Sequence, residues 1–197
     1  ELLLQNTDIL VVTHFMSPAD VGIYFAAGKT MALIMFVHYA VGSAVAHKFA
    51  ALHARGDHDG LRSFVKDAVN WTFWPSLASA IVILALGKPL LSLFGPQFES
   101  GYPVMFILVI GFLMRSAMGP AEYLLNMLGE QKICATVLIG AALANIALNF
   151  ILVPRFGLVG AASATAMSLT GAALLNAIVV WHRLDIKIAI WKNLPKF

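Results

Sequence analysis

The stretch from residue 133 to residue 184 decides the fold. It reads ICATVLIGAALANIALNFILV at residues 133–153, PRFG at 154–157 and LVGAASATAMSLTGAALLNAIVVWHRL at 158–184. Each apolar run has the ~20 residues that a helix needs to cross the hydrocarbon core of a bilayer. The proline and glycine between the two runs are typical of a turn. The stretch therefore predicts two membrane-spanning helices joined as a hairpin.

The composition of the whole chain predicts the same class. Of the 197 residues, 60% are hydrophobic and 12% are charged, and the mean hydropathy is +0.83. A soluble domain carries about 25% charged residues, roughly twice as many. Apolar runs near twenty residues recur, whereas the period-two alternation of an outer-membrane barrel does not. We therefore expect an all-α, polytopic membrane protein, and the composition excludes an ordinary soluble enzyme.

Apolar runs and turn residues divide the chain into six predicted crossings. These crossings are expected at residues 2–16, 21–46, 71–86, 103–128, 133–153 and 158–184. The first is short for a full crossing, so we expect the sequence to begin inside a helix, without a signal peptide. Residues 1–184 are thus predicted to form one six-helix bundle with a truncated first helix. Residues 185–197 are predicted to form a basic, amphipathic tail on the membrane surface.

The positions of Lys and Arg predict the orientation of the bundle. If six helices alternate, one side holds Lys48, Arg55, Arg62, Lys66, Lys132, Arg183, Lys187, Lys192 and Lys196, and the other holds Lys88 and Arg155. Cytoplasmic loops carry the excess of positive charge, so both ends of the sequence are expected in the cytoplasm. Because these charges are spread between apolar segments, the net charge of +3 does not indicate nucleic-acid binding.

Charged residues inside predicted crossings need a partner or a hydrated cavity, since each costs about 2.5–3.5 kcal/mol in the hydrocarbon core. Asp8 and Lys29 lie at similar distances from the turn at residues 17–20, on either side of it. They are therefore expected at similar depth in an antiparallel hairpin, where they could form an ion pair. Two roles remain open for this pair: a structural clamp between helices, or part of a cavity that couples to substrate or ions.

Arg115 is the second intramembrane cation. At ~1.5 Å per residue it lies roughly 18 Å along the helix predicted to begin at Pro103, close to the middle of the bilayer. Glu122 follows two turns later on the same predicted face. A guanidinium stays charged in any environment and binds phosphate through two parallel hydrogen bonds. Arg115 is expected either to pair with a carboxylate of another helix or to contact a phosphate in a transport cavity.

Asn145 and Asn149 share one face of the fifth predicted helix, because they are four residues apart. Their amides could form hydrogen bonds between helices or contact a sugar. The six histidines show no metal-ligand spacing and have no nucleophile beside them, and Cys134 is the only cysteine. The sequence therefore predicts no catalytic residue, no metal site and no cofactor.

Several short motifs together resemble a known family. The most specific is Asn145–Pro154 followed by Gly157–Thr165, and weaker matches are Asp8 with Val21–Tyr24, Leu91–Gly95 and Leu128–Lys132. These residues resemble the polysaccharide transporters of the multidrug/oligosaccharidyl-lipid/polysaccharide flippase superfamily, over nearly the whole chain. The resemblance is to the C-terminal half, one of two six-helix lobes around a V-shaped cavity that opens alternately to each side. It implies an N-terminal helical lobe as partner.

The resemblance also implies a function. The expected substrate is an oligosaccharide on undecaprenyl pyrophosphate, flipped across the bacterial inner membrane for lipopolysaccharide, capsule or exopolysaccharide biosynthesis. The expected cavity residues are Lys29, Arg115, Asn145 and Asn149, and the expected coupling or ion-pair residues are Asp8 and Glu122. One alternative is a cation-coupled multidrug efflux transporter of the same superfamily, which an acidic pocket would favour. A membrane glycosyltransferase or acyltransferase is the third, but no loop is long enough to hold its catalytic cluster.

Overall fold

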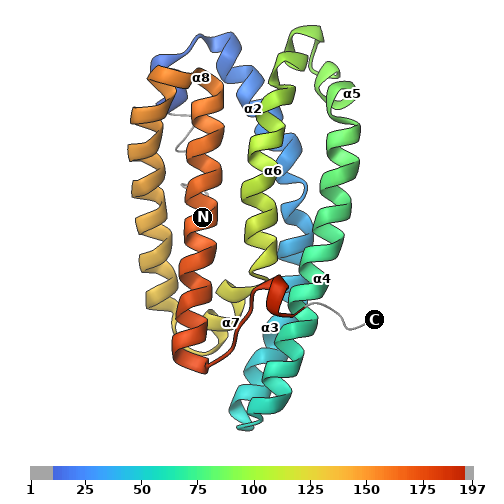
Figure 1. Ribbon diagram of the computed structural model, residues 1–197, viewed down its shortest axis with the longest axis vertical. Coiled ribbons are helices and arrows are strands. Elements are labelled where there is room, and N and C mark those ends of the chain that lie inside the picture. Colours follow the sequence, from blue (N-terminus) through green and yellow to red (C-terminus); the bar gives the residue numbers. More distant parts are fainter. Residues whose placement is uncertain (1–10, 194–197) are drawn as a thin grey trace.

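The computed structural model describes residues 11–193, and this part of the chain is helical without any strand. Residues 11–15 are helical. The following elements are α2 (Pro18–Ala32), α3 (Met35–Ala54), α4 (His58–Ala85), α5 (Gly87–Ser92), η1 (Pro96–Gly101), α6 (Tyr102–Ala117), α7 (Ala121–Met127), α8 (Gln131–Leu184) and η2 (Ile190–Lys192). The long helices run side by side as a bundle (Figure 1). The predicted all-α class is confirmed for the described residues.

Four helical segments of residues 11–193 are long and apolar enough to cross a membrane. They are Pro18–Ala54, His58–Ala85, Pro96–Ala117 and Gln131–Leu184. The last contains both arms of the predicted hairpin, at residues 131–156 and 158–184, and each arm exceeds the ~20 residues that one crossing needs. The first predicted crossing, residues 2–16, lies mostly outside the described residues. The count of six crossings therefore stays a prediction.

The reversal inside α8 occurs at Gly157, whose φ of 55° and ψ of −133° are not helical. Figure 1 shows the two arms of α8 lying side by side in opposite directions. A residue with a Cβ would be strained in this left-handed region, which glycine visits readily. The arms also approach closely, because a Cβ added at Gly160 would collide with the carbonyl oxygen of Leu152. The hairpin predicted from the turn at residues 154–157 is confirmed.

Two predicted helices are wrong in their extent. The run at residues 21–46 is divided at Leu33 and Ile34, and its second part continues to Ala54. The helix predicted over 103–128 ends at Ala117, and α7 begins after Pro120. Gly119 has a φ of 60°, and proline has no N–H to donate to a continuing helix, so the chain changes direction there. The length of the apolar run predicted one continuous helix and so did not reveal this break.

Helix α4 begins at His58, well before the crossing predicted at residues 71–86, and continues through it as one element. It begins after Asp57, whose side chain accepts a hydrogen bond of 2.8 Å from the Gly60 N–H and so caps the first turn. Pro75 lies within the helix and does not end it. Helices α3 and α4 extend together beyond the rest of the bundle, at the bottom of Figure 1.

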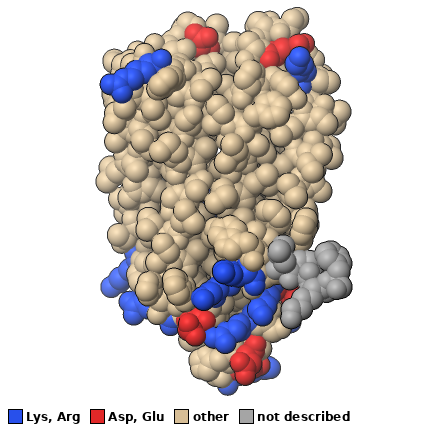
Figure 2. All heavy atoms as spheres, viewed as in Figure 1, with Lys and Arg blue, Asp and Glu red and all other residues tan. Residues whose placement is uncertain are grey.

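The charged side chains gather at the two ends of the bundle. Figure 2 shows a broad band without Lys, Arg, Asp or Glu on the visible face, with more charges at the end where α3 meets α4. At this end Arg62 pairs with Asp185 at 3.3 Å and Arg183 with Glu130 at 3.5 Å. An apolar band between charged ends is the surface expected of a protein embedded in a bilayer. Which end faces the cytoplasm stays a prediction.

The chain after α8 packs against the bundle as a segment that we call the C-terminal strap (residues 185–193). It is non-helical up to Ala189 and then forms the short helix η2. Its side chains alternate: Ile186, Ile188 and Ile190 are buried, whereas Asp185 and Lys187 are exposed. The isoleucines join an apolar cluster that also contains residues of α3 and α4. Exposed and buried side chains thus alternate over residues 185–188, whereas the basic, amphipathic surface tail over residues 185–197 stays a prediction. Residues 194–197 of the predicted tail lie outside the described residues.

Candidate membrane cavity

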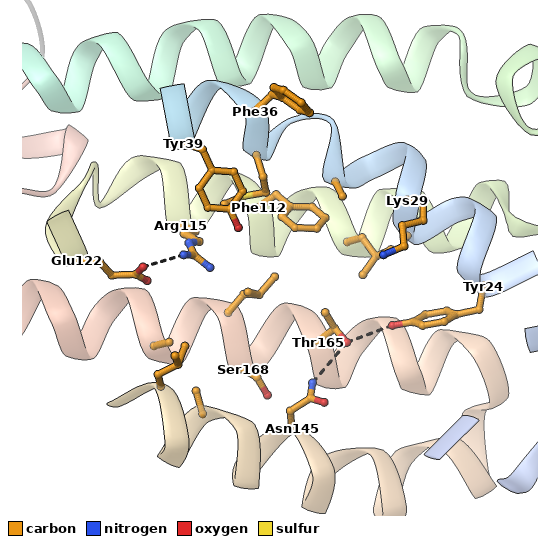
Figure 3. Close-up of a pocket in the computed structure, with 18 of the residues that line it drawn as sticks. Tyr24, Lys29, Phe36, Tyr39, Phe112, Arg115, Glu122, Asn145, Thr165 and Ser168 are labelled. Atoms are coloured by element: carbon orange, nitrogen blue, oxygen red, sulfur yellow. Dashed lines mark hydrogen bonds and ion pairs between the residues drawn. The ribbon is translucent and has the colours of Figure 1, made fainter. Parts of the chain in front are cut away.

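One cavity of about 200 Å³ opens between α2, α3, α6, α7 and both arms of α8. The residues that line it recur every three or four positions, as in Leu108, Phe112 and Arg115 of α6. This spacing places them on one face of a helix. The close-up in Figure 3 shows polar and charged side chains reaching into a mainly aromatic and aliphatic space. The cavity is therefore a polar site inside an apolar bundle.

An ion pair between Arg115 and Glu122 lies at one end of the cavity (Figure 3). Nη2 of Arg115 donates to Oε2 of Glu122 at 2.9 Å, and the exposed fractions of the two side chains are 9% and 25%. In one continuous helix these residues would lie about 10 Å apart along the axis. The break at residues 118–120 brings them together. Arg115 lies in the last turn of α6 and Glu122 in the first turn of α7, so each charge is favoured by its helix dipole.

This geometry corrects the position expected for Arg115. We predicted a cation halfway along a helix over 103–128, with Glu122 further along the same helix. Because α6 ends at Ala117, Arg115 lies near the end of its helix instead, and its carboxylate partner belongs to another helix. The pairing was one of the two roles left open for Arg115. Since the same side chain lines the cavity, a role in substrate binding stays open as well.

Lys29 lines the same cavity from the last turn of α2. Its Nζ atom lies 5.1 Å from the ring centroid of Phe25, a cation–π contact. Figure 3 shows Lys29 towards the Tyr24 side of the cavity and Arg115 towards Glu122 on the opposite side. Asp8, its expected partner, lies outside the described residues, so the Asp8–Lys29 pair stays a prediction. The cavity thus holds cations at two separate positions.

A polar network crosses the cavity wall between α2 and the two arms of α8. The hydroxyl groups of Tyr24 and Thr165 lie 3.1 Å apart, and Nδ2 of Asn145 donates to Oγ1 of Thr165 at 3.4 Å. Asn149 is fully buried, and its Nδ2 donates to the carbonyl oxygen and Oδ1 of Asn145, at 2.9 and 3.0 Å. Asn145 lines the cavity, whereas Asn149 lies behind it. The structure thus separates two asparagines that share a helix face.

Comparison with known families identifies the chain. The family described as MatE matches residues 1–151, which include Lys29, Arg115, Glu122 and Asn145. This chain belongs to the MatE family. It is a multi-pass membrane protein, consistent with its apolar helices.

Relatives of this MatE chain include proteins named as flippases. It is 24% identical over 181 residues to the probable low-salt glycan biosynthesis flippase Agl15 of Haloferax volcanii, covering 91% of this chain and 38% of the relative. It is 25% identical over 171 residues to the probable flippase AglR of the same organism, covering 85% and 36%. The uncharacterized membrane protein EpsK of Bacillus subtilis is 27% identical over 180 residues, covering 90% and 35%. No solved structure gives a significant match.

The comparisons confirm the resemblance to polysaccharide flippases that the motifs indicated. The chain spans somewhat more than a third of the length of these relatives. The match therefore supports a membrane protein related to flippases.

Several residues that line the cavity of this MatE chain were not predicted from the sequence. They are Tyr24, Phe36, Tyr39, Phe112, Thr165 and Ser168. The signal was present in part, because Tyr24, Gly28, Ala32, Met35 and Tyr39 recur every three or four positions across α2 and α3. Apolar residues occupy every face of these helices, however, so hydropathy did not show which face turns inward. Among residues 11–193, no group of three His, Cys, Asp or Glu side chains could hold a metal ion.

Proposed function

We propose that this chain forms the C-terminal lobe of a transporter that flips an oligosaccharide linked to undecaprenyl pyrophosphate. Transport would run from the cytoplasmic to the outer leaflet of a bacterial inner membrane, for the synthesis of lipopolysaccharide, capsule or exopolysaccharide. One observation carries the proposal: Lys29 and Arg115 reach into a single cavity within an apolar bundle. The flippase names of the relatives support the same class.

The proposal matches the physical problem that a flippase solves. A pyrophosphate cannot enter hydrocarbon without cations to replace its hydration. In this proposal Arg115 binds a phosphate through its guanidinium, and Lys29 provides a second positive charge further along the cavity. The amide of Asn145 and the hydroxyl of Thr165 provide hydrogen-bond partners for sugar hydroxyls. Asn149 holds the side chain of Asn145 from behind.

In this proposal, the residues that line the cavity form one side of the transport path. The cavity's volume of about 200 Å³ is too small for an oligosaccharide. The proposal assigns the opposite wall to an N-terminal helical lobe, with the two lobes rocking about the central site. An ion gradient or removal of the product would drive the cycle. Glu122, and Asp8 outside the described residues, are the carboxylates we propose for coupling.

A second candidate is a cation-coupled multidrug transporter, which the MatE family match also fits. A specific observation favours it: Glu122 lines the cavity together with the aromatic rings of Phe36, Tyr39 and Phe112. A carboxylate beside aromatic rings suits an organic cation. The ion pair with Arg115 argues against this reading, since it already balances the charge of Glu122. In the sugar-lipid proposal an incoming pyrophosphate competes with Glu122 for Arg115.

The test uses the complete transporter with Arg115→Gln and Glu122→Gln combined, which removes both charges without leaving either partner unpaired. We expect the variant to reach normal protein levels and to lose polysaccharide export. Arg155→Gln is the control, because Arg155 lies at the α8 reversal and does not line the cavity. Undiminished export by the double variant would overturn the proposal. Efflux of a cationic dye that is lost in the same variant, with no effect on export, would favour the multidrug candidate.

A further inference from the structure

A second polar cavity lies at the opposite side of the bundle from the α8 reversal, between α4 and the C-terminal strap. Its volume is about 340 Å³, and it is lined by Arg62 and Lys66 of α4 and by Asp185, Lys187, Lys192 and Asn193 of the strap. Four of these side chains are cations and one is a carboxylate, so the lining has a net charge of +3. The transport proposal does not use this site.

Specific hydrogen bonds fix the strap wall of this cavity. Nδ2 of Asn193 donates to the carbonyl oxygens of Lys187 and Ala189, at 2.7 and 3.0 Å, which closes the strap into a loop. Nδ2 of Asn70 on α4 donates to the carbonyl oxygen of Asn193 at 2.8 Å. Arg62 donates to the carbonyl oxygen of Asp185 at 3.0 Å. Both ends of the strap are therefore tied to α4, which fixes this wall of the cavity.

The positive charge in this cavity is only partly balanced within the described chain. Arg62 pairs with Asp185, whereas among residues 11–193 no carboxylate forms an ion pair with Lys66, Lys187 or Lys192. Lys187 lies 5.3 Å from the ring centroid of Trp181. An excess of cations at one end of the bundle is common in membrane proteins. This general bias does not explain why Arg62, Lys66, Lys187 and Lys192 line one cavity, since other cations at this end lie outside it.

The depth of the cavity indicates the class of its ligand. The exposed indole of Trp71 on α4 is of the kind that marks a membrane interface. Along the helix axis, Lys66 lies about 7 Å and Arg62 about 13 Å further towards the charged end. A headgroup layer is roughly 5–7 Å thick on each side of the hydrocarbon core. Lys66 is thus placed at headgroup level, beside the apolar surface that acyl chains cover.

We propose that this cavity binds the phosphate of an anionic phospholipid headgroup. Lys66 meets the phosphate from α4, and Lys187 and Lys192 meet it from the strap, so that a bound lipid joins the two. Arg62 lies further from the hydrocarbon and holds Asp185 of the strap. A basic cavity between membrane helices at the face rich in Lys and Arg is suited to this ligand. The site is separate from the membrane cavity, and its occupancy does not depend on what the transporter carries.

The test measures binding of phosphatidylglycerol to the complete, purified transporter by native mass spectrometry, with phosphatidylcholine as the zwitterionic probe. The site variant combines Lys187→Gln with Lys192→Gln. The matched control combines Lys48→Gln with Lys132→Gln, which removes equal charge from the same end of the bundle, outside the cavity. At about 1 kcal/mol per cation, the dissociation constant for phosphatidylglycerol should rise about 20-fold to 30-fold in the site variant. We expect less than about a twofold change in the control.

Three results would overturn the proposal: equal weakening in both variants, no weakening in either, or inorganic phosphate binding as tightly as the lipid. The last would indicate a site for a free anion. Because both lysine side chains are exposed, their replacement leaves the buried contacts of the strap intact. Lys187→Arg with Lys192→Arg should retain binding, which separates charge from a folding defect. If the glutamine pair fails to fold, Lys192→Gln alone should weaken binding about fivefold.

Discussion

Two cavities of this protein each contain an Arg–carboxylate pair: the membrane cavity, which Lys29 and Arg115 line, and the strap cavity, between α4 and residues 185–193. The two pairs differ in how far they are exposed to water. The side chains of Arg115 and Glu122 are 9% and 25% exposed, and their atoms meet at 2.9 Å. The side chains of Arg62 and Asp185 are 49% and 83% exposed, and their atoms lie 3.3 Å apart. The same two chemical groups thus occur once inside the bundle and once in contact with water.

The difference shows why each arrangement needs its own support. Inside the bundle, a charge without a partner loses most of its solvation, so Arg115 requires Glu122 and two favourable helix ends. At the charged end, water and ions screen each cation, and several can gather without paired carboxylates. In the membrane cavity Arg115 therefore needs a paired carboxylate. The strap cavity, in contrast, can hold more cations than carboxylates, and this excess positive charge can bind an anion.

The largest expected effect is that of Arg115→Met, which removes the 2.9 Å ion pair with Glu122 inside the bundle. Breaking a buried pair on one side should lower the free energy of unfolding by about 3–5 kcal/mol. Unfolding in mixed detergent micelles measures this change. Adding Glu122→Gln should restore most of the loss. A cost below about 1 kcal/mol for the single variant would show that this pair behaves like the exposed one.

The attachment of the strap should depend on its isoleucines more than on its charges. Ile188 is 3% exposed in the cluster with α3 and α4. Ile188→Ala removes buried apolar area and should weaken strap attachment by about 2–3 kcal/mol. Hydrogen exchange of residues 185–193 measures this, with Trp191→Ala as the exposed control. Unchanged protection in Ile188→Ala would place the anchor of the strap elsewhere.

Close helix packing behind the membrane cavity gives a third, smaller effect. A Cβ at Gly111 of α6 would lie 2.7 Å from Cα of Ala166 and 3.2 Å from its carbonyl oxygen. Gly111→Ala should therefore separate α6 from α8 and lower the free energy of unfolding by about 1–2 kcal/mol. Gly140→Ala is the control, because nothing lies within 4 Å of its Cβ. The control should keep or raise the melting temperature, since alanine favours helices over glycine by about 1 kcal/mol.

The smallest effect is expected for Arg62→Ala at the strap cavity. Its pair with Asp185 is largely exposed, so the free energy of unfolding should fall by less than about 1 kcal/mol. Thermal unfolding at low and high salt measures the change, which should shrink further as salt screens the pair. A loss as large as that of Arg115→Met would remove the distinction between the two cavities.

The α8 hairpin was predictable because two strong local signals agree there. Long apolar runs flank Pro154 and Gly157, and the backbone reverses at that glycine. The break after α6 was missed although Gly119 and Pro120 stand in the sequence, because apolar residues continue on both sides of them. Hydropathy reflects the free energy of transferring side chains into lipid. This free energy is the same whether the helix continues or bends, so hydropathy does not reveal the break.

The site residues show the same division. Lys29, Arg115 and Asn145 were chosen from the sequence because charges and amides in lipid need partners, and all three line one cavity. Asn149 shares their chemistry and lies behind the wall. Tyr24 and Thr165, whose hydroxyls meet at 3.1 Å, are far apart in the sequence, so no local pattern could join them.

The sequence by itself determined that the chain is apolar and helical and that α8 forms a hairpin. It also determined that the few charged side chains inside the bundle cost free energy unless they have partners. These follow from transfer energies and turn chemistry, which act over a few residues. Only the tertiary structure decided that Glu122 meets Arg115 across a broken helix, that the cavity holds Lys29 as well, and that the strap closes a basic cavity against α4. These depend on how helices pack, because a side chain's neighbours on other helices are set by distance in space and not by distance along the chain.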